Sequence, residues 1–357
     1  MAAIVSIAST ELNDFEKYYL EKYNPLGVTF FAKNIENKAQ LKKLTDSIKE
    51  CTGRDDVVLA VDQEGGRVRR LTEPEFRGTE AQIALGKIRD KFNEATAEEI
   101  ISAHAALIAS DMADAGLNLN YAPVLDIAYD NTTPVLYSRC FGNDEKQTAV
   151  YGKIVIDTYI KYGISPCMKH MPGHGRAVVD PHLSLPVLDY PLQELEKDFY
   201  PFMQNRECPA GMTAHIVIPE IDEQYPATQS AKVIDRIIRG KMDFDGLLIS
   251  DSITMQALKG SVGERTKATL EAGCDVVCYC MGTKTGLTEV AENCTFLTDK
   301  SLLRFEKIKN IYHNGIKVKD ADRLAGRYRE IVGTIEKYND SYDATEVLRK
   351  MTTTGVK

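Results

Sequence analysis

The sequence predicts an α/β fold, a single (β/α)8 barrel of the TIM type, and three observations support this. Short apolar runs rich in β-branched residues alternate with segments of helical periodicity, this unit recurs eight times, and charged residues follow the strand runs. Near-continuous apolar runs are typical of parallel strands that are covered on both faces. Eight such units favour a closed parallel barrel, with a doubly wound open sheet as the alternative.

The eight predicted strands follow one another from the N-terminus to residue 280. They are Ala3–Ala8, Val28–Phe31, Val57–Val61, Leu117–Tyr121, Ile164–Met168, Ala210–Ala214, Gly246–Ser250 and Cys274–Cys280. Helical periodicity fills most of the intervals. Thr96 and Glu99 have the spacing of a capping box and predict the start of the helix before the fourth strand. Asp144 is the predicted cap of the next helix.

The chain is predicted to form one domain. Residues 1–298 hold the eight units, and residues 299–357 are charged and helix-periodic. We expect this last segment to be a helical extension packed on the barrel. Single barrels of this length are common.

Composition narrows the classes of partner and compartment. The 357 residues carry a formal net charge of -8, which argues against nucleic acid or an anionic membrane as the main partner. The first residues lack the basic segment of a signal peptide, and no apolar run is long enough to span a membrane. We therefore expect a cytoplasmic protein, a monomer or weak dimer, whose partner is a small molecule.

The eight cysteines contain no CxxC pair. Cys274, Cys278 and Cys280 share parity within one apolar run, which favours a buried strand with small apolar side chains. A metal or redox role is the less favoured interpretation. In a reducing compartment the thiols are expected to be free.

Charged residues come directly after the predicted strands. In barrels of this type the active site lies at the carboxyl ends of the strands. The residues found there are Asp62 after the third strand, Asp126 and Arg139 after the fourth, Lys169 and His170 after the fifth, His215 after the sixth and Asp251 after the seventh. Because these strand ends open on one rim, the sequence predicts a polar pocket.

Asp251 is the candidate nucleophile, since a carboxylate at the mouth of an apolar strand is costly without partners. Its alternative role is that of a helix N-cap. Asp180 and His182 stand two residues apart in a loop, a spacing that lets the carboxylate orient an imidazole acid/base. The alternative for this pair is a polar surface loop.

A zinc site is the main rival interpretation of this region. His170, His174, Asp180 and His182 are all competent ligands. However, Pro172 interrupts the helix that an HxxxH ligand pair requires, so no metal is predicted. Arg70, Arg139 and Lys169 are candidates for binding sugar hydroxyls or a carboxylate, with solvated surface charges as the alternative.

At these motifs the sequence resembles bacterial β-N-acetylhexosaminidases of glycoside hydrolase family 3, in particular the single-domain cytoplasmic type of cell-wall recycling. The resemblance runs from the first strand to about residue 295. It is carried by FFAKN at 30–34, AVDQEGGRVRR at 60–70, NLNYAPVLDI at 118–127, RCFGND at 139–144, KHMPGHG at 169–175, DPHLSLP at 180–186, MTAHI at 212–216 and FDGLLISDSITM at 244–255.

The resemblance implies a role for each matching position. Asp251 matches the nucleophile of a retaining hydrolase, and His182 matches an unusual histidine acid/base that is paired with Asp180. The sugar-binding positions are matched by Asp62, Arg70, Arg139, Lys169 and His170. The implied substrates are muropeptides with a terminal, non-reducing β-linked N-acetylglucosamine, and neither cofactor nor metal is implied.

Four positions depart from the common family pattern: Arg176, Pro181, Cys140 and Ser252. Arg176 and Pro181 put loop dynamics and aglycone choice in doubt, but no proposed catalytic group is lost. Two other functions stay open on the same scaffold. One is a phosphorylase, because a neutral histidine repels phosphate less than a carboxylate does. The other is a sugar-binding relative without catalysis.

Overall fold

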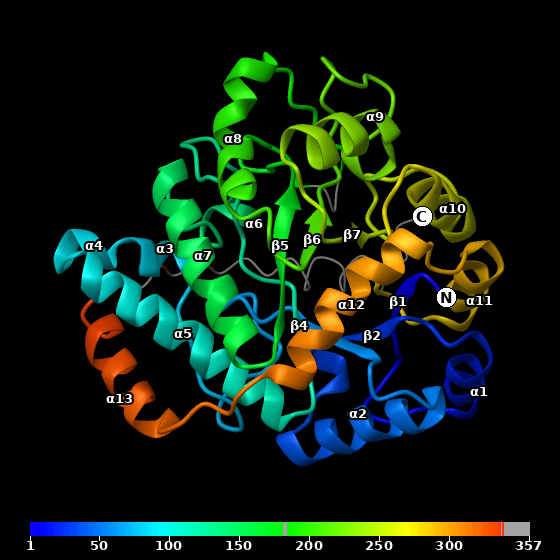
Figure 1. The fold of residues 1–357 in the computed structure, drawn as a ribbon, viewed down its shortest axis with the longest axis horizontal. Coiled ribbons are helices and arrows are strands. Elements are labelled where there is room, and N and C mark those ends of the chain that lie inside the picture. Colours follow the sequence, from blue (N-terminus) through cyan, green and yellow to red (C-terminus); the bar gives the residue numbers. More distant parts are fainter. Residues whose placement is uncertain (181–183, 337, 339–357) are drawn as a thin grey trace.

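The protein is a closed barrel of eight parallel strands surrounded by helices (Figure 1). This computed structural model describes residues 1–180, 184–336 and 338. The strands pair in chain order, and β8 closes the barrel on β1. They are β1 (Ala3–Ser6), β2 (Gly27–Phe30), β3 (Val58–Val61), β4 (Leu119–Asn120), β5 (Ser165–Met171), β6 (Ala210–Thr213), β7 (Leu247–Ser252) and β8 (Val276–Tyr279). The predicted fold class is confirmed.

Helices occupy the intervals between the strands and follow the last strand (Figure 1). The α-helices are α1 (Asp14–Tyr23), α2 (Lys38–Thr52), α3 (Gln82–Gly86), α4 (Ile88–Lys91), α5 (Glu94–Asp114), α6 (Pro134–Tyr137), α7 (Glu145–Lys161), α8 (Leu192–Gln204), α9 (Ala231–Val233), α10 (Val262–Glu271), α11 (Lys284–Asn293), α12 (Asp299–Asn314) and α13 (Ala321–Val332). Short 3-10 helices lie at η1 (Ala32–Asn34) and η2 (Ala227–Gln229), and α9 continues into the π-helix η3 (Ile234–Lys241).

Some strand boundaries differ from the prediction. β5 continues through Lys169 and His170, and β7 continues through Asp251, so these polar residues lie within the strands rather than after them. The ladder is made by backbone groups, and Lys169 still pairs with Met212 of β6. β4 is shorter than predicted, although backbone hydrogen bonds continue on both sides of it, from Asn118 N to Leu59 O and from Tyr121 N to Val61 O, each at 3.0 Å.

One predicted helix start is wrong and one is confirmed. The cap of α5 is Asn93, whose side chain accepts from the backbone N–H of Thr96 at 2.9 Å. Thr96 therefore lies in the first turn, because asparagine caps a helix as well as threonine does and stands three residues earlier. Asp144 caps α7 as predicted, accepting from Lys146 N at 2.8 Å and Gln147 N at 3.0 Å.

The amino-terminal end of the barrel is closed by α12, which crosses it in Figure 1. Phe305 and Ile308 are buried in the same apolar cluster as Ile4 and Leu247, which lie where β1 and β7 begin. Arg304 holds the helix in place through Asp275, at 3.0 Å, just before β8. Side chains of α12 therefore fill the interior of the barrel at its amino-terminal end, and a binding site can form only at the carboxyl end.

The last described helix, α13, packs against α5 and reaches the loop after β3. The Tyr328 hydroxyl accepts from Glu80 N at 2.9 Å and lies 3.2 Å from His104 Nδ1. The other ring nitrogen of His104 lies 3.1 Å from the carbonyl oxygen of Glu64. Since a neutral imidazole has one donor and one acceptor, His104 donates to Glu64 and accepts from Tyr328. The division of the chain at residue 298 stays a prediction.

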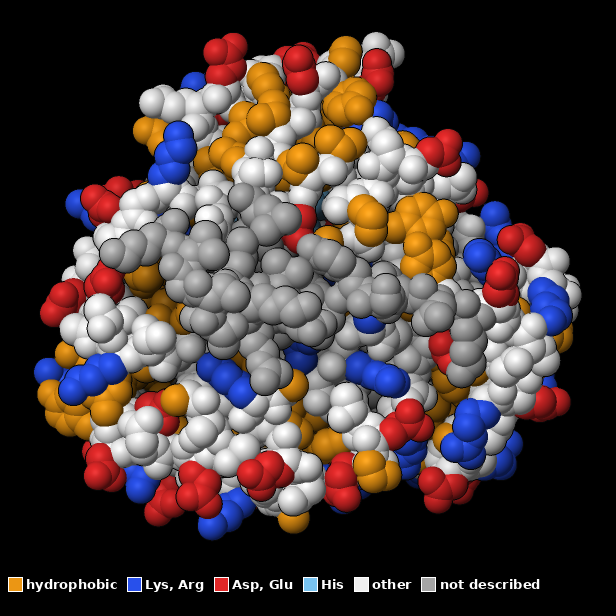
Figure 2. All heavy atoms as spheres, turned by 180° about the vertical axis from the view of Figure 1, so that it is seen from behind, with side chains coloured by type: hydrophobic (Ala, Val, Ile, Leu, Met, Phe, Trp, Pro, Cys, Tyr) orange, Lys and Arg blue, Asp and Glu red, His pale blue; other side chains and the backbone are white. Residues whose placement is uncertain are grey.

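The surface that Figure 2 shows carries acidic and basic side chains interspersed around its edge. Such mixing gives no broad field of one sign over the part of that face that the structure describes. Across the described ranges, the helices are all too short or too polar to pass through a lipid bilayer.

We expect Ile308→Ala to lower the free energy of unfolding by about 2–5 kcal/mol, because it leaves a cavity where α12 closes the barrel. Leu303→Ala, on the same helix but 69% exposed, is the matched control and changes stability by less than about 0.5 kcal/mol. Equilibrium urea unfolding measures both. Equal effects of the two substitutions would show that α12 does not close the core.

Candidate active site

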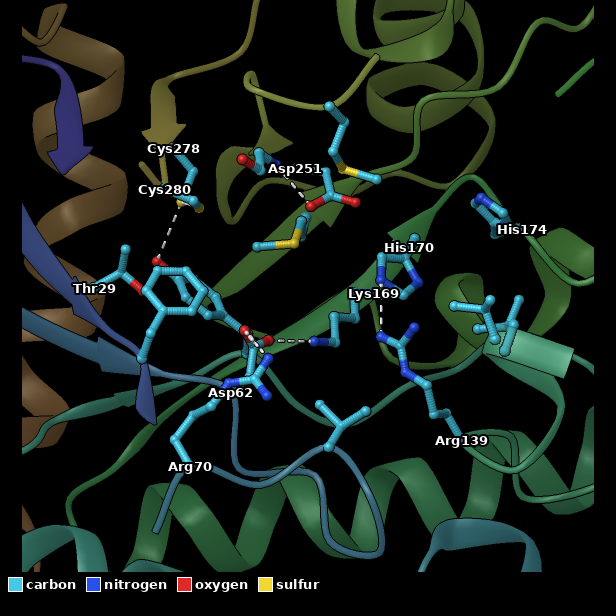
Figure 3. Close-up of a pocket in the computed structure, with 18 of the residues that line it drawn as sticks. Thr29, Asp62, Arg70, Arg139, Lys169, His170, His174, Asp251, Cys278 and Cys280 are labelled. Carbon is cyan, nitrogen blue, oxygen red and sulfur yellow. Dashed lines mark hydrogen bonds and ion pairs between the residues drawn. The ribbon is translucent and has the colours of Figure 1, made fainter. Parts of the chain in front are cut away.

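A pocket opens at the carboxyl ends of the strands, where the sequence analysis places the site (Figure 3). It is lined by six of the eight predicted site residues: Asp62, Arg70, Arg139, Lys169, His170 and Asp251. They come from the loop after β3, the segment after α6, and strands β5 and β7. Residues distant in the chain therefore share one cavity, as parallel strands that end on one rim require.

The two remaining predicted residues lie in the loop after β5. Asp180 is buried, and the part of the pocket wall that the structure describes does not include it. His182 lies outside the described residues. The pairing of Asp180 with His182 therefore stays a prediction.

A buried ion network forms one side of the pocket, and Glu64 is at its centre. Arg139 grips both carboxylate oxygens of Glu64, with two N–O distances of 2.8 Å. Lys169 Nζ lies 2.6 Å from Glu64 and 2.8 Å from Asp62. Such bidentate, charge-assisted pairs fix both geometry and charge. Lys169 and Arg139 are thereby held in position at the edge of the cavity.

The pKa shifts follow from this mutual pairing. Burial alone raises the pKa of Glu64, but the positive charges of Arg139 and Lys169 outweigh it and hold that pKa below its ordinary value. Burial lowers the pKa of Lys169, and the carboxylates of Asp62 and Glu64 raise it above the ordinary value. Glu64, Lys169 and Arg139 are therefore charged at neutral pH.

A second carboxylate, Asp126, orders the two histidines of the KHMPGHG segment. It is fully buried and lies 2.7 Å from His170 Nδ1, while its other oxygen accepts from the backbone N–H of His174 at 2.6 Å. The remaining nitrogen of His170, Nε2, lies 3.3 Å from Arg139 Nη2. Because a guanidinium only donates, we assign the proton of a neutral His170 to Nδ1.

The position of Arg70 is set by the loop after β3. The side chain of Gln63 accepts from the backbone N–H groups of Arg70 and Leu71, each at 2.9 Å. The backbone N–H of Gln63 in turn donates to the side chain of Asn120 in β4. The tight turn at Gly65 has φ +101, and a Cβ there would lie 2.4 Å from Glu80 O. Only glycine fits this turn, which brings Arg70 to within 3.7 Å of Asp62.

Asp251 lies across the cavity from Asp62 and Lys169 (Figure 3). One of its oxygens accepts from the backbone N–H of Ser252 at 2.7 Å, which fixes the carboxylate at the end of β7. The helix-cap alternative does not describe this geometry, because the cap of the next helix, α10, is Ser261. The pocket thus presents one carboxylate opposite a cluster of hydrogen-bonding charged groups.

His174 also lines the pocket, although the sequence analysis named it only as a possible metal ligand. It is 5% exposed, its ring stands edge-on to His170, and neither of its ring nitrogens has a hydrogen-bond partner among the described residues. Burial lowers the pKa of His174 to about 4, so the imidazole is neutral at physiological pH. A buried polar ring that faces a cavity without partners is suited to a ligand.

Glu64 is the organising residue that the sequence analysis did not place in the site, whereas Asp126 was placed at the rim but without its contacts to the two histidines. The available signal was the position of each carboxylate just after a buried strand, where an unpaired charge is costly. Among the described residues, no group of three or more histidine, cysteine or acidic side chains is arranged to hold a metal ion.

The family model for the glycosyl hydrolase family 3 N terminal domain matches residues 3–307. The chain belongs to glycosyl hydrolase family 3. It is therefore a glycoside hydrolase, and the family match covers the whole barrel, together with the first part of α12.

Relatives within family 3 cover most of the chain. A beta-hexosaminidase of Neisseria meningitidis is 36% identical over 282 residues, which are 78% of this chain and 77% of the relative. A beta-hexosaminidase of Bordetella avium is 33% identical over 282 residues, 78% of this chain and 79% of the relative. The crystal structure of NagZ from Neisseria gonorrhoeae in complex with N-trifluoroacetyl-D-glucosamine has a TM-score of 0.83 and 29% identity, covering 93% of this chain and 98% of that chain.

We expect Glu64→Gln to lower the free energy of unfolding by about 3–5 kcal/mol, because Arg139 loses its buried counter-charge and Lys169 keeps only that of Asp62. Glu98→Gln, on the exposed side of α5, is the matched control and leaves stability unchanged. Urea unfolding at neutral pH measures both. Equal stability of Glu64→Gln and wild type would contradict the central place of Glu64.

Proposed function

We propose that the protein is a retaining β-N-acetylglucosaminidase that removes the terminal, non-reducing N-acetylglucosamine from peptidoglycan fragments. The supporting observation is the placement of Asp251 opposite Asp62 and Lys169 in one pocket. A nucleophile on one side of a cavity and polyol-binding groups on the other are what a glycosidase needs to hold a sugar ring with its anomeric carbon toward the carboxylate.

The charged cluster is suited to hydroxyl groups. Asp62 accepts hydrogen bonds, whereas Lys169, Arg70 and Arg139 only donate them. Their mutual pairing keeps these groups fixed before the sugar arrives, so little reorganisation is needed on binding. In this proposal a sugar hydroxyl pair lies between Asp62 and the donors.

The proposed chemistry has two steps. Asp251 attacks the anomeric carbon, the bond to the departing oxygen breaks, and His182 gives that oxygen a proton while Asp180 orients its imidazole. In the second step His182 takes a proton from water, the water oxygen attacks the anomeric carbon, and the carboxylate of Asp251 leaves. Two inversions retain the β-configuration. The chemistry requires no metal or organic cofactor.

The sugar identity rests on the relatives. The curated relatives are named beta-hexosaminidases, and the solved NagZ structure holds an N-acylated glucosamine. The muropeptide aglycone and a cytoplasmic location rest on the resemblance to the cell-wall-recycling type. The partner is in this proposal a small carbohydrate, with no nucleic acid or membrane involved.

His174 is assigned a contact with the bound substrate. Figure 3 places it at the side of the pocket away from Arg70 and Asp62, beyond His170. Its neutral ring offers one donor and one acceptor, and both are unused in the described structure. Binding of substrate therefore satisfies a group that is otherwise buried without a partner.

Asp251→Ala tests the nucleophile. Turnover of an aryl β-N-acetylglucosaminide is expected to fall by about a thousandfold or more, because the covalent step is lost. Asp243→Asn, whose side chain is 81% exposed, is the control and keeps wild-type turnover. Full turnover by Asp251→Ala would rule the mechanism out.

The same assay separates the alternative functions. In phosphate-free buffer the wild-type enzyme is expected to release N-acetylglucosamine and to prefer this substrate over the matching aryl glucoside. If added phosphate made a sugar 1-phosphate the main product, the protein would be a phosphorylase. Calorimetric binding of N-acetylglucosamine without turnover would make it a sugar-binding relative.

His174→Phe is expected to lower kcat/KM for the aryl substrate by about tenfold or more, because one or two hydrogen bonds to substrate are lost. The phenyl ring keeps the edge contact with His170, so the fold is retained. His313→Phe, at an exposed position on α12, is the matched control. A His174→Phe enzyme with kcat/KM within twofold of wild type would show that His174 does not contact the substrate.

A further inference from the structure

Two thiols meet in the wall of the pocket. Cys278 lies in β8, and Cys280 is the first residue after this strand. Both line the cavity, and their sulfur atoms are 3.6 Å apart. Figure 3 shows the pair on the far side of Asp251 from His174. Cys278 is buried, Cys280 is half-buried, and neither is in a disulfide. The proposed hydrolysis uses neither sulfur.

The backbone geometry allows these two sulfurs to be joined. Residues two apart on a strand point to the same face, with Cα atoms about 6.6 Å apart, which is inside the range of up to about 6.8 Å found in disulfides. The sulfurs must approach from 3.6 Å to a bond length of about 2.05 Å. β8 ends at Tyr279, so Cys280 lies outside the ladder and is able to shift.

We propose that Cys278 and Cys280 are a modification site, an active-site dithiol that small disulfide oxidants convert to an intramolecular disulfide that stops turnover. Cys280, the more exposed thiol, loses its proton and attacks a sulfur of glutathione disulfide, releasing one glutathione as its thiolate. Cys278 then loses its proton and attacks the mixed disulfide, which releases the second. Two protein thiols are oxidised, and one glutathione disulfide is reduced to two glutathione molecules.

The disulfide acts on the nucleophile through the backbone of β7. The backbone N–H of Cys278 donates to Ser250 Oγ at 2.9 Å, and its carbonyl accepts from Ile253 N at 3.0 Å. These contacts flank Asp251 on both sides along the chain. Drawing the sulfurs together therefore strains the segment that orients the carboxylate, and a misplacement of about 1 Å costs up to about a hundredfold in rate.

The surroundings of Cys278 set the order of the two attacks. Its sulfur lies 3.7 Å from the Tyr121 hydroxyl, in the apolar interior of the barrel. The hydrogen bond with Cys280 and burial raise the pKa of the Cys278 thiol well above its ordinary value. Cys278 is therefore the resolving thiol rather than the first to react.

The test treats the reduced full-length enzyme with glutathione disulfide, removes the reagent and measures turnover, free thiols and the cross-linked peptide by mass spectrometry. We expect a Cys278–Cys280 disulfide, two fewer free thiols and a loss of turnover of at least about tenfold, since small displacements of a nucleophile are costly. Dithiothreitol restores turnover. The loss of turnover rests on the proposed function, whereas the cross-link does not.

Three variants make the test specific. Cys278→Ser and Cys280→Ser cannot form the cross-link. Measured without dithiothreitol, each is expected to lose turnover only in the fraction that mass spectrometry shows to carry a mixed disulfide on the remaining thiol. Cys51→Ser, at a half-buried position away from the pocket, stays as sensitive as wild type. Because each variant is compared with itself, changes in basal activity do not matter.

Two outcomes overturn the proposal. One is oxidation that joins other cysteines, or leaves only mixed disulfides, while Cys278 and Cys280 stay unlinked. The other is a mapped Cys278–Cys280 disulfide in an enzyme with undiminished turnover. If the reduced enzyme shows no hydrolysis, the proposed function fails, and the mapped cross-link alone decides whether the dithiol reacts.

Discussion

The buried carboxylate of Glu64 is the interaction on which the rest of the site depends. It neutralises Arg139 and Lys169 at once, and through Lys169 it positions Asp62. Without it, Arg139 would be buried without its bidentate partner, and Asp62 alone would neutralise Lys169. Its backbone carbonyl is in turn held by His104, which contacts Tyr328 of α13. The last described helix, α13, therefore supports Glu64 through His104.

The two ends of the barrel have different roles: apolar packing stabilises the amino-terminal end, and the pocket lies at the carboxyl end. At the amino-terminal end, α12 closes the interior with apolar side chains and an arginine that pairs with Asp275. At the carboxyl end, polar residues of β5 and β7 extend the strands into the pocket rather than into loops. Residues on regular strands are held more rigidly than residues on loops, which suits groups that must meet a reacting carbon with little error.

Much of this arrangement was predictable, because the apolar runs mark the strands and parallel strands end on one rim. Six of the eight proposed site residues meet in one pocket, but their functional roles remain proposals. The partners of Glu64 and Asp126 were not predictable, because Arg139 and His170 are far away in the chain. Asn93 displaced the predicted cap of α5, since such a local hydrogen bond competes with the pattern.

The central claim is that Asp251 forms a covalent bond to the sugar, and trapping that intermediate tests it most directly. The enzyme would be incubated with a fluorinated β-N-acetylglucosaminide that forms the intermediate faster than water resolves it, and then digested for mass spectrometry. The account predicts that the peptide containing Asp251 gains the mass of the sugar. An adduct on another residue would contradict it, as would normal turnover of a good substrate with no adduct at all.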